Sequence, residues 1–324
     1  MYNILQKYFS SLVFLVKVII IAGAYYIISE KLLHDSNFQQ IAWTERMSVL
    51  GPWGVMFLIG ILFLSLFNWI LEIFKWQSLV DLIHPISFRT ASKQSLASLT
   101  ASLITPNRVG EYGAKAAFFQ KKHRPKVLLL NFISNSYQML ITILLGTIGL
   151  FFLRDYIAEI QFQVTTFYGI AGIMVAMGMG WVFIYKKWTK WIEKLWNDFK
   201  SIPQSIHKKT LLFSLGRYFV FSHQFYFFLL FFGVDIDYFV ALPVIYSMYL
   251  IASIIPGFVL FDWLVKGSVA VTLFGYFGVH EIVVLSITAS MWILNFAVPA
   301  MIGSFYVITF KAKSFEFNES KVLK

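Results

Sequence analysis

Long apolar runs, each about the length of a helix that crosses a bilayer, follow one another along the chain. Stretches such as VIIIAGAYYII and GVMFLIGILFLSLF are continuously apolar, whereas the strands of a transmembrane barrel alternate apolar and polar residues. The pattern predicts an all-α polytopic membrane protein, with residues 1–324 forming a single transmembrane domain. Six spanning helices are expected, at 11–29, 54–74, 127–152, 164–185, 211–232 and 282–309.

Two further apolar segments, 95–119 and 238–277, are each interrupted near the middle by a proline and polar residues. The prolines are Pro106 and Pro256. A proline removes a backbone hydrogen bond, and bare carbonyls are tolerated at membrane depth only where protein or water covers them. Each segment is therefore predicted to be a broken re-entrant hairpin of two helices beside a polar cavity.

The charges between the spans predict which side each connection faces, because Lys and Arg collect on the cytoplasmic side. Connection 108–126 holds six Lys and Arg residues against Glu111, and connection 186–209 holds seven lysines against two acids. The other connections carry more acids than bases: 30–53, 153–163 and 233–237. The protein is therefore predicted to lie in the inner cell membrane with both termini in the cytoplasm. The first hairpin is predicted to open toward the cytoplasm and the second toward the outside.

Large apolar side chains recur at helical spacing within the linker 186–209, with lysines between them. These side chains are Trp188, Trp191, Leu195 and Phe199. The pattern predicts an interfacial helix in the cytoplasmic headgroup layer that joins two halves of the chain. A plain juxtamembrane linker with snorkelling lysines is the alternative.

The two hairpin segments resemble each other at an offset of 151 residues, at which ASLI (101–104) matches ASII (252–255). Two halves follow, 11–152 and 164–309, each with two spans, a hairpin and a third span. Because three crossings is an odd number, the halves point in opposite directions across the bilayer. The sequence thus predicts an inverted repeat, the architecture of many secondary transporters, with substrate bound where the repeats meet.

Ionisable residues follow both breaks, where burial costs several kcal/mol unless the charge is paired. At the same offset, Glu111 and Lys115 match Asp262 and Lys266, and the i,i+4 spacing puts each acid and base on one helical face. Arg108 and the lysines suit a phosphate headgroup, and the acids suit an ammonium group or a proton relay. Alternatively, each pair only fixes its hairpin. The candidate binding residues are Pro106, Asn107, Arg108, Gly110, Glu111, Lys115, Pro256, Gly257, Asp262 and Lys266.

Other polar residues receive structural interpretations. Arg217 and His223 lie on different faces of one span and are interpreted as headgroup contacts or interhelical donors, and Glu72 and Lys75 as an interfacial pair. Small residues at every fourth position predict close helix packing, at the repeat interface or in a homo-oligomer: Gly172, Ala176 and Gly180.

The composition excludes several function classes. A chain that is 58% hydrophobic and 13% charged needs lipid around it. Its net charge of +11 comes from residues that flank the spans, so no nucleic-acid partner is expected. With no cysteine, and six histidines that lack metal-ligand spacing, neither a metal nor another cofactor is expected.

The stretch SLITPNRVGEYGAKAAFF, residues 102–119, resembles the Pro-x-Arg-x-Gly-Glu signature of the lysylphosphatidylglycerol synthase transmembrane-region family, also called flippase-like proteins. The length, the hairpin positions and Pro256-Gly257 extend the resemblance over about the whole chain. The family's second motif is reduced to IIPGFVLFDWLVKGS, where Asp262 stands for its glutamate. The resemblance implies a module that moves a phospholipid or lipid-linked glycan between leaflets, here without the soluble aminoacyl-transferase domain sometimes fused to it.

These observations predict a translocator of a phospholipid or lipid-linked saccharide, with membrane lipids and a lipid-linked substrate as partners and no catalytic residues. The alternative is an ion-coupled transporter of a small solute, which an inverted repeat permits equally well. An intramembrane enzyme acting on a lipid phosphate would need a histidine or two acids near the breaks, and no histidine lies within ten residues of Pro106 or Pro256.

Overall fold

The computed structural model describes residues 43–44, 46–103, 105, 108–154, 193–194, 196–255 and 262–310. The predicted spans 11–29 and 164–185 lie outside these residues. So do several residues singled out in the sequence: Pro106, Asn107, Gly172, Ala176, Gly180, Trp188, Trp191, Leu195, Pro256 and Gly257.

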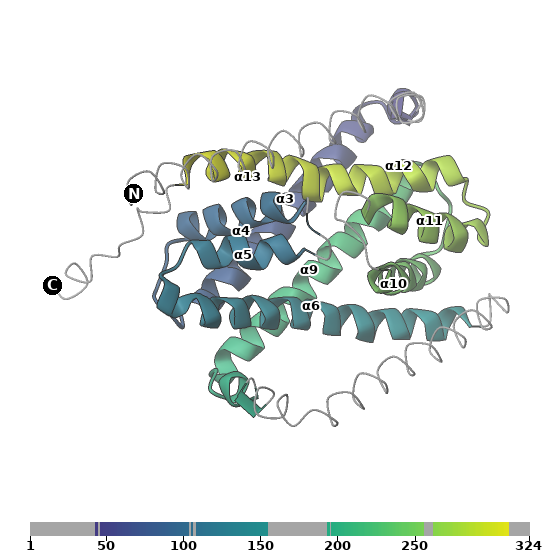
Figure 1. The fold of residues 1–324 in the computed structure, drawn as a ribbon. Helices are drawn as coiled ribbons and strands as arrows, with labels where there is room; N and C mark the ends of the chain where they lie inside the picture. The colour runs from purple at the N-terminus through teal and green to yellow at the C-terminus, as the bar shows by residue number, and fades with distance from the viewer. Residues whose placement is uncertain are drawn as a thin grey trace.

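Every regular element of the described part is helical, which confirms the all-α prediction (Figure 1). In chain order the elements are α3 (Pro52–Val80), α4 (Phe88–Ser102), α5 (Val109–Ala117), the 3-10 turn η1 (Lys121–His123), α6 (Arg124–Leu153), α9 (Gln204–Phe231), α10 (Tyr238–Ile254), α11 (Asp262–Gly275), α12 (Glu281–Trp292), the π-helical segment η3 (Ile293–Ala297) and α13 (Val298–Thr309).

Three described helical stretches are long and apolar enough to cross a bilayer, and the chain is therefore a multi-pass membrane protein. They are Pro52–Val80, Lys121–Leu153 and Glu281–Thr309, and they contain the predicted spans 54–74, 127–152 and 282–309. The predicted span 211–232 falls on α9, which has 28 residues but is not among these three stretches. Arg217 and His223 make α9 more polar than the three stretches that are apolar enough to span.

Both predicted hairpin segments are broken into two helices, as the prolines indicated. In the first, α4 ends at Ser102 and α5 begins at Val109. In the second, α10 ends at Ile254 and α11 begins at Asp262.

The first hairpin begins at Phe88, seven residues before the predicted start at 95. Ser87 caps α4 by accepting a hydrogen bond of 3.3 Å from the Thr90 amide. Of the polar residues that delayed the predicted start, Arg89 is exposed, but Gln94 is buried and its side chain accepts a 2.8 Å hydrogen bond from the Trp76 indole. Tertiary contacts therefore extend the helix beyond its apolar part.

Each hairpin packs between two of the long helices. The first lies against α13 and α6, where α4 contacts α13 and α5 contacts α6, and the second lies against α6 and α12, where α10 contacts α6 and α11 contacts α12. Figure 1 shows the two hairpins at opposite ends of α6. Glycines permit the close approach of α4 to α13 and of α10 to α6, because a Cβ at Gly303 would overlap the Leu96 carbonyl and one at Gly146 would overlap Leu250.

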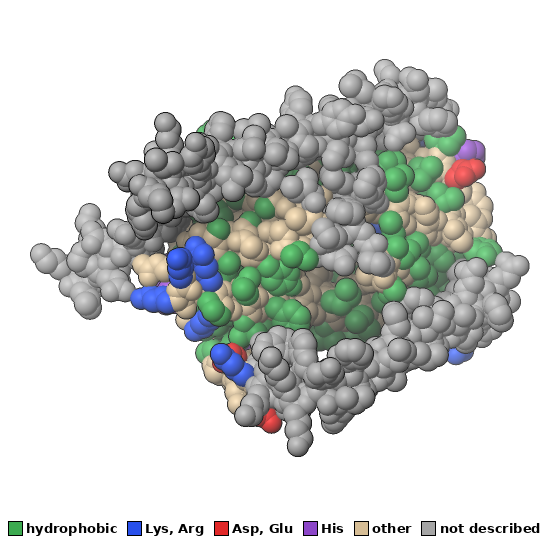
Figure 2. Space-filling view, viewed as in Figure 1, with side chains coloured by type: hydrophobic (Ala, Val, Ile, Leu, Met, Phe, Trp, Pro, Cys, Tyr) green, Lys and Arg blue, Asp and Glu red, His purple; other side chains and the backbone are tan. Residues whose placement is uncertain are grey.

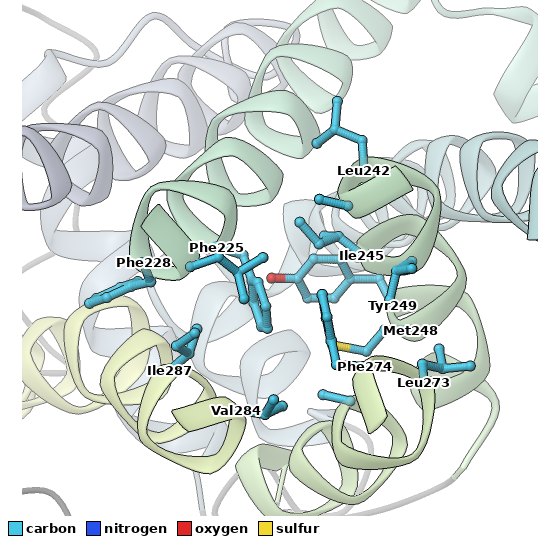
Figure 3. Close-up of a cluster of buried hydrophobic side chains, with 14 of the residues drawn as sticks. Phe225, Phe228, Leu242, Ile245, Met248, Tyr249, Leu273, Phe274, Val284 and Ile287 are labelled. Carbon is cyan, nitrogen blue, oxygen red and sulfur yellow. The ribbon is translucent and has the colours of Figure 1, made fainter. Parts of the chain in front are cut away.

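An aromatic and aliphatic core holds α9, α10, α11 and α12 together. Figure 3 shows its side chains pointing toward one another from all four helices. Phe225 of α9 stacks on Phe274 of α11 with ring centroids 5.5 Å apart. Ile245 of α10 and Ile287 of α12 belong to the same cluster and are fully buried. This core fixes the second hairpin to the helices on either side of it.

The outer faces of the long helices are apolar and exposed. On α3 the exposed side chains include Ile59, Leu62, Phe63 and Leu66. Figure 2 shows apolar side chains over the middle of the molecule, with most of the visible Lys and Arg at the end where α6 begins. An apolar belt with cations at one end is typical of a protein that spans a membrane.

Part of the predicted interfacial linker is described. Residues 196–200 are helical, and the rings of Trp196 and Phe199 stack with centroids 5.8 Å apart. Phe199 packs against a buried cluster that includes Trp76 and Val127. The described end of the linker is thus attached to the protein body, and its place in the headgroup layer stays a prediction.

Candidate functional site

One cavity of about 290 Å³ is lined by residues from both hairpins and from α3, α6, α9, α12 and the π-helical segment. Five of the ten candidate residues line it: Arg108, Glu111, Lys115, Asp262 and Lys266. The structure thus brings together two groups of residues that are 151 positions apart in the chain. Polar and aromatic side chains complete the wall, among them Asn68, Trp69, Gln138, Arg217, Tyr249, Trp263 and Asn295.

Lys115 is held by protein groups on several sides. Its ammonium donates hydrogen bonds of 2.8 Å to Glu111 Oε1 and 2.8 Å to Asn131 Oδ1, and it lies 4.2 Å from the ring centroid of Trp76. Only 1% of the Lys115 side chain is exposed. This confirms the predicted Glu111–Lys115 pair and satisfies a charge whose burial would otherwise be costly.

Arg108 is the more accessible cation of the first hairpin. It precedes α5 with φ at 59°, a left-handed conformation that L residues other than Asn and Asp seldom adopt. Its Nη2 lies 2.8 Å from Glu111 Oε2, while 40% of its side chain is exposed. Its Nε has no hydrogen-bond partner among the described residues. The guanidinium therefore keeps donors available for a ligand in the cavity.

Gly110 has a packing role and does not line the cavity. Its amide donates a 2.8 Å hydrogen bond to Thr105 Oγ1, and a Cβ there would overlap the Ala101 carbonyl. The absence of a side chain therefore lets the start of α5 lie against the end of α4. Its neighbours Arg108 and Glu111 reach the cavity from this turn.

The second hairpin contributes a more open ion pair. Lys266 Nζ lies 2.6 Å from Asp262 Oδ2, which confirms the predicted pairing, and the two side chains are 27% and 30% exposed. Lys266 also lies 5.6 Å from the ring centroid of Tyr249 and 5.4 Å from that of Phe296. A cation near two aromatic rings is partly compensated for its loss of water.

Glu72 and Lys75 form the predicted ion pair, but its predicted interfacial position was wrong. Both are buried, with Lys75 Nζ 2.8 Å from Glu72 Oε2, and Glu72 also forms an ion pair with Arg217 of α9. Arg217 Nε donates a 3.0 Å hydrogen bond to Asn68 Oδ1. Glu72 and Arg217 line the cavity, although no local sequence pattern links residues 145 positions apart. The available signal was their ionisable character inside apolar spans.

His223 is a satisfied interhelical partner, one of the two interpretations offered for it. Its Nε2 is 2.9 Å from the Tyr238 hydroxyl, and its Nδ1 is 2.8 Å from the Phe219 carbonyl. It does not line the cavity.

Asn295 is the centre of a buried polar network at the π-helical segment. Its Oδ1 accepts from Asn68 at 3.1 Å, and its Nδ2 donates to Gln224 Oε1 at 2.9 Å. Pro299 has no amide hydrogen for the Asn295 carbonyl, and the Trp69 indole donates to that carbonyl instead, at 3.1 Å. The proline thus explains both the local π-helix and the need for polar partners on α3 and α9.

Residues 14–303 match the family model described as the lysylphosphatidylglycerol synthase TM region. This chain belongs to that family. No curated protein and no solved structure gives a significant match. Of the signature residues of the lysylphosphatidylglycerol synthase TM-region family noted in the sequence, Arg108 and Glu111 line the cavity and Gly110 supports their turn.

Proposed function

We propose that this protein moves a phospholipid or a lipid-linked saccharide between the two leaflets of the inner membrane. The observation that carries the proposal is that ionisable side chains from both broken hairpins line one cavity, beside long helices with an apolar exterior. A polar headgroup can then pass through the protein while its acyl or prenyl chains stay in lipid. Membrane lipids and the lipid-linked substrate are its proposed partners.

In this proposal Arg108 binds the phosphate of the headgroup. Its guanidinium presents donors in a planar fork that matches phosphate oxygens, and its exposed position lets it reach a ligand. Lys115 instead holds Glu111 and Asn131 in place. The polar side chains Asn68, Gln138 and Thr142 add hydrogen-bonding groups to the cavity wall.

We further propose that the two halves, 11–152 and 164–309, form an inverted repeat with re-entrant hairpins. The packing supports this, because exchanging the halves turns the contacts of one hairpin with the long helical stretches into those of the other. The contact of α4 with α13 becomes that of α10 with α6, and the contact of α5 with α6 becomes that of α11 with α12. Glu111 and Asp262 correspondingly occupy the first turns of α5 and α11.

The proposed topology has both termini in the cytoplasm and can be tested with single cysteines, because the chain contains none. Asp235 and Lys122 are both exposed and lie in connections predicted to face opposite sides. A membrane-impermeant maleimide added outside intact cells should label Asp235→Cys and leave Lys122→Cys unlabelled. The reverse pattern would overturn the topology. A homo-oligomer stays a prediction, since the small-residue stripe that suggested it lies outside the described residues.

We propose a transport role without covalent chemistry. Glu72, Glu111 and Asp262 are all in ion pairs, which leaves no described carboxylate of the cavity free as a general base. Expression in a host that lacks lysylated phosphatidylglycerol should therefore yield none of this lipid. Its appearance would show that the chain is an aminoacyl-transferase.

The transport proposal is tested with purified protein in vesicles. Fluorescent phospholipids in the inner leaflet should become accessible to an external quencher faster than in protein-free vesicles. The Arg108→Gln variant should return the rate to background. Uptake of small solutes without lipid movement would favour the ion-coupled transporter instead.

A further inference from the structure

The charges around the cavity do not balance. Among the described residues, three carboxylates line it, Glu72, Glu111 and Asp262, and four cationic side chains line it as well: Arg108, Lys115, Arg217 and Lys266. Lys75, bound to Glu72, adds a fifth cation. The described residues that line the cavity, together with Lys75, thus carry two more positive than negative charges.

The excess lies at the two glutamates, each of which is shared by two cations. Glu72 pairs with Lys75 and Arg217, and Glu111 pairs with Arg108 and Lys115, whereas Asp262 has Lys266 alone. Every carboxylate that lines the cavity in the described part of the chain is therefore already paired with protein cations. An incoming ammonium group would have to displace one of them, while an incoming anion would neutralise the excess.

Arg108 supplies a second observation that points to an anion. Its Nε is buried and has no hydrogen-bond partner in the described part of the chain, although its Nη2 pairs with Glu111. A guanidinium N–H left without an acceptor in a buried place is costly unless a ligand supplies one. Phosphate oxygens would complete the coordination of this guanidinium.

We propose that the cavity selects a headgroup with net negative charge, in which a phosphate is not balanced by an ammonium group. Anionic phospholipids and prenyl-phosphate saccharides fit this description, and zwitterionic or aminoacylated lipids do not. The inference rests on the proposed function, because it names the substrate class of the same site. The phosphate chemistry is shared by a lipid headgroup and by free phosphate, and the experiment separates these two sources.

The test compares acyl-labelled phosphatidylglycerol, phosphatidylethanolamine and lysylated phosphatidylglycerol in vesicles that contain the purified protein. Phosphatidylglycerol should move roughly tenfold faster than the other two, because charges at contact distance interact strongly in a protein cavity. Equal rates for all three lipids would overturn the charge selectivity and leave the proposed function standing. Uptake of radiolabelled inorganic phosphate without movement of any lipid would overturn the proposed function and identify free phosphate as the ligand of the anion site.

The variants Asp262→Asn and Lys266→Gln provide a matched test, since both remove the same ion pair but change the charge in opposite directions. Asp262→Asn should raise the ratio of the phosphatidylglycerol rate to the phosphatidylethanolamine rate, and Lys266→Gln should lower it. The charge-preserving variants Asp262→Glu and Lys266→Arg should leave the ratio unchanged. If Asp262→Asn and Lys266→Gln shift the ratio in the same direction, or leave it unchanged, the pair is structural and the inference is wrong. Melting temperatures identify any variant that fails to fold.

Discussion

Lys115 donates a 2.8 Å hydrogen bond to Asn131 and thereby ties α5 to α6. The same ammonium binds Glu111 and faces Trp76, and its side chain is almost fully buried. The sequence assigned Lys115 and Arg108 the same candidate role, and these contacts give them different roles. Lys115 stabilises the first hairpin, and Arg108 remains open to a ligand.

We predict that Lys115→Met lowers stability strongly. Removing one partner of a buried ion pair leaves the other charge poorly compensated and costs about 3–5 kcal/mol. Here Glu111 keeps Arg108, so we expect a loss of roughly 3 kcal/mol in the free energy of unfolding, measured by denaturation in detergent.

The exposed cation Lys121 serves as the control, and Lys121→Met should change stability by less than about 0.5 kcal/mol. In the Lys115→Gln, Glu111→Gln double variant part of the stability should return, because no buried carboxylate is then left with the partly exposed Arg108 as its single cation. Transport should not return, since Glu111 also holds Arg108. Full transport by this double variant would leave the pair with a purely structural role.

Arg108→Gln should have the opposite effect, with little change in stability and a large loss of lipid movement. The side chain is 40% exposed and makes one described ion pair, so its loss should change stability by only about 1 kcal/mol. Lipid movement in vesicles should nevertheless fall to background, because the guanidinium is the proposed phosphate ligand. Arg108→Lys, which keeps the charge but loses the planar fork, should retain partial activity. If Arg108→Gln moves lipid at the wild-type rate, Arg108 does not bind the headgroup.

Trp69 and Pro299 should be energetically coupled. The Trp69 indole donates a hydrogen bond to the Asn295 carbonyl, to which Pro299 cannot donate because it has no amide hydrogen. Trp69→Phe should therefore cost roughly 1–2 kcal/mol of stability in the wild type and less in a Pro299→Ala background, where an amide hydrogen becomes available. A double-mutant cycle measures this difference.

The control for Trp69 lies on the same helix. Trp53 is 66% exposed, and Trp53→Phe should cost much less than Trp69→Phe. Equal costs of Trp69→Phe in both backgrounds would show that the indole hydrogen bond does not compensate for the proline.

The parts of the site that the sequence predicted depend on local rules. Helical spacing alone places Glu111 beside Lys115 and Asp262 beside Lys266. The prolines predicted a break within each hairpin segment, and the predicted repeat placed Glu111 and Lys115 in the same site as Asp262 and Lys266. Each of these inferences used residues that are close in the chain or equivalent by a fixed offset.

The parts that were missed depend on tertiary contact. Glu72 meets Arg217 only because α3 packs on α9, and no spacing rule connects them. Asn295 gains its partners in the same way, although Pro299 within the predicted span 282–309 was a visible sign of an irregular helix. The polar start of α4 was misjudged because a buried Gln94 is indistinguishable in sequence from an exposed one.

The close approach of the hairpins to the long helices gives a final prediction, for Gly303→Ala and Gly146→Ala. A Cβ at Gly303 would overlap the Leu96 carbonyl and Thr100, and one at Gly146 would overlap Leu250, so each variant should push a hairpin off its neighbour and cost roughly 1–3 kcal/mol. Gly60 has open space around it, and Gly60→Ala should be neutral or stabilise α3 by up to about 1 kcal/mol. Because α4 on α13 and α10 on α6 are counterparts in the proposed inverted repeat, both glycine variants should also slow lipid movement to a similar degree. If Gly303→Ala slows it and Gly146→Ala does not, then only the first hairpin depends on this close packing and the functional equivalence of the two halves is lost.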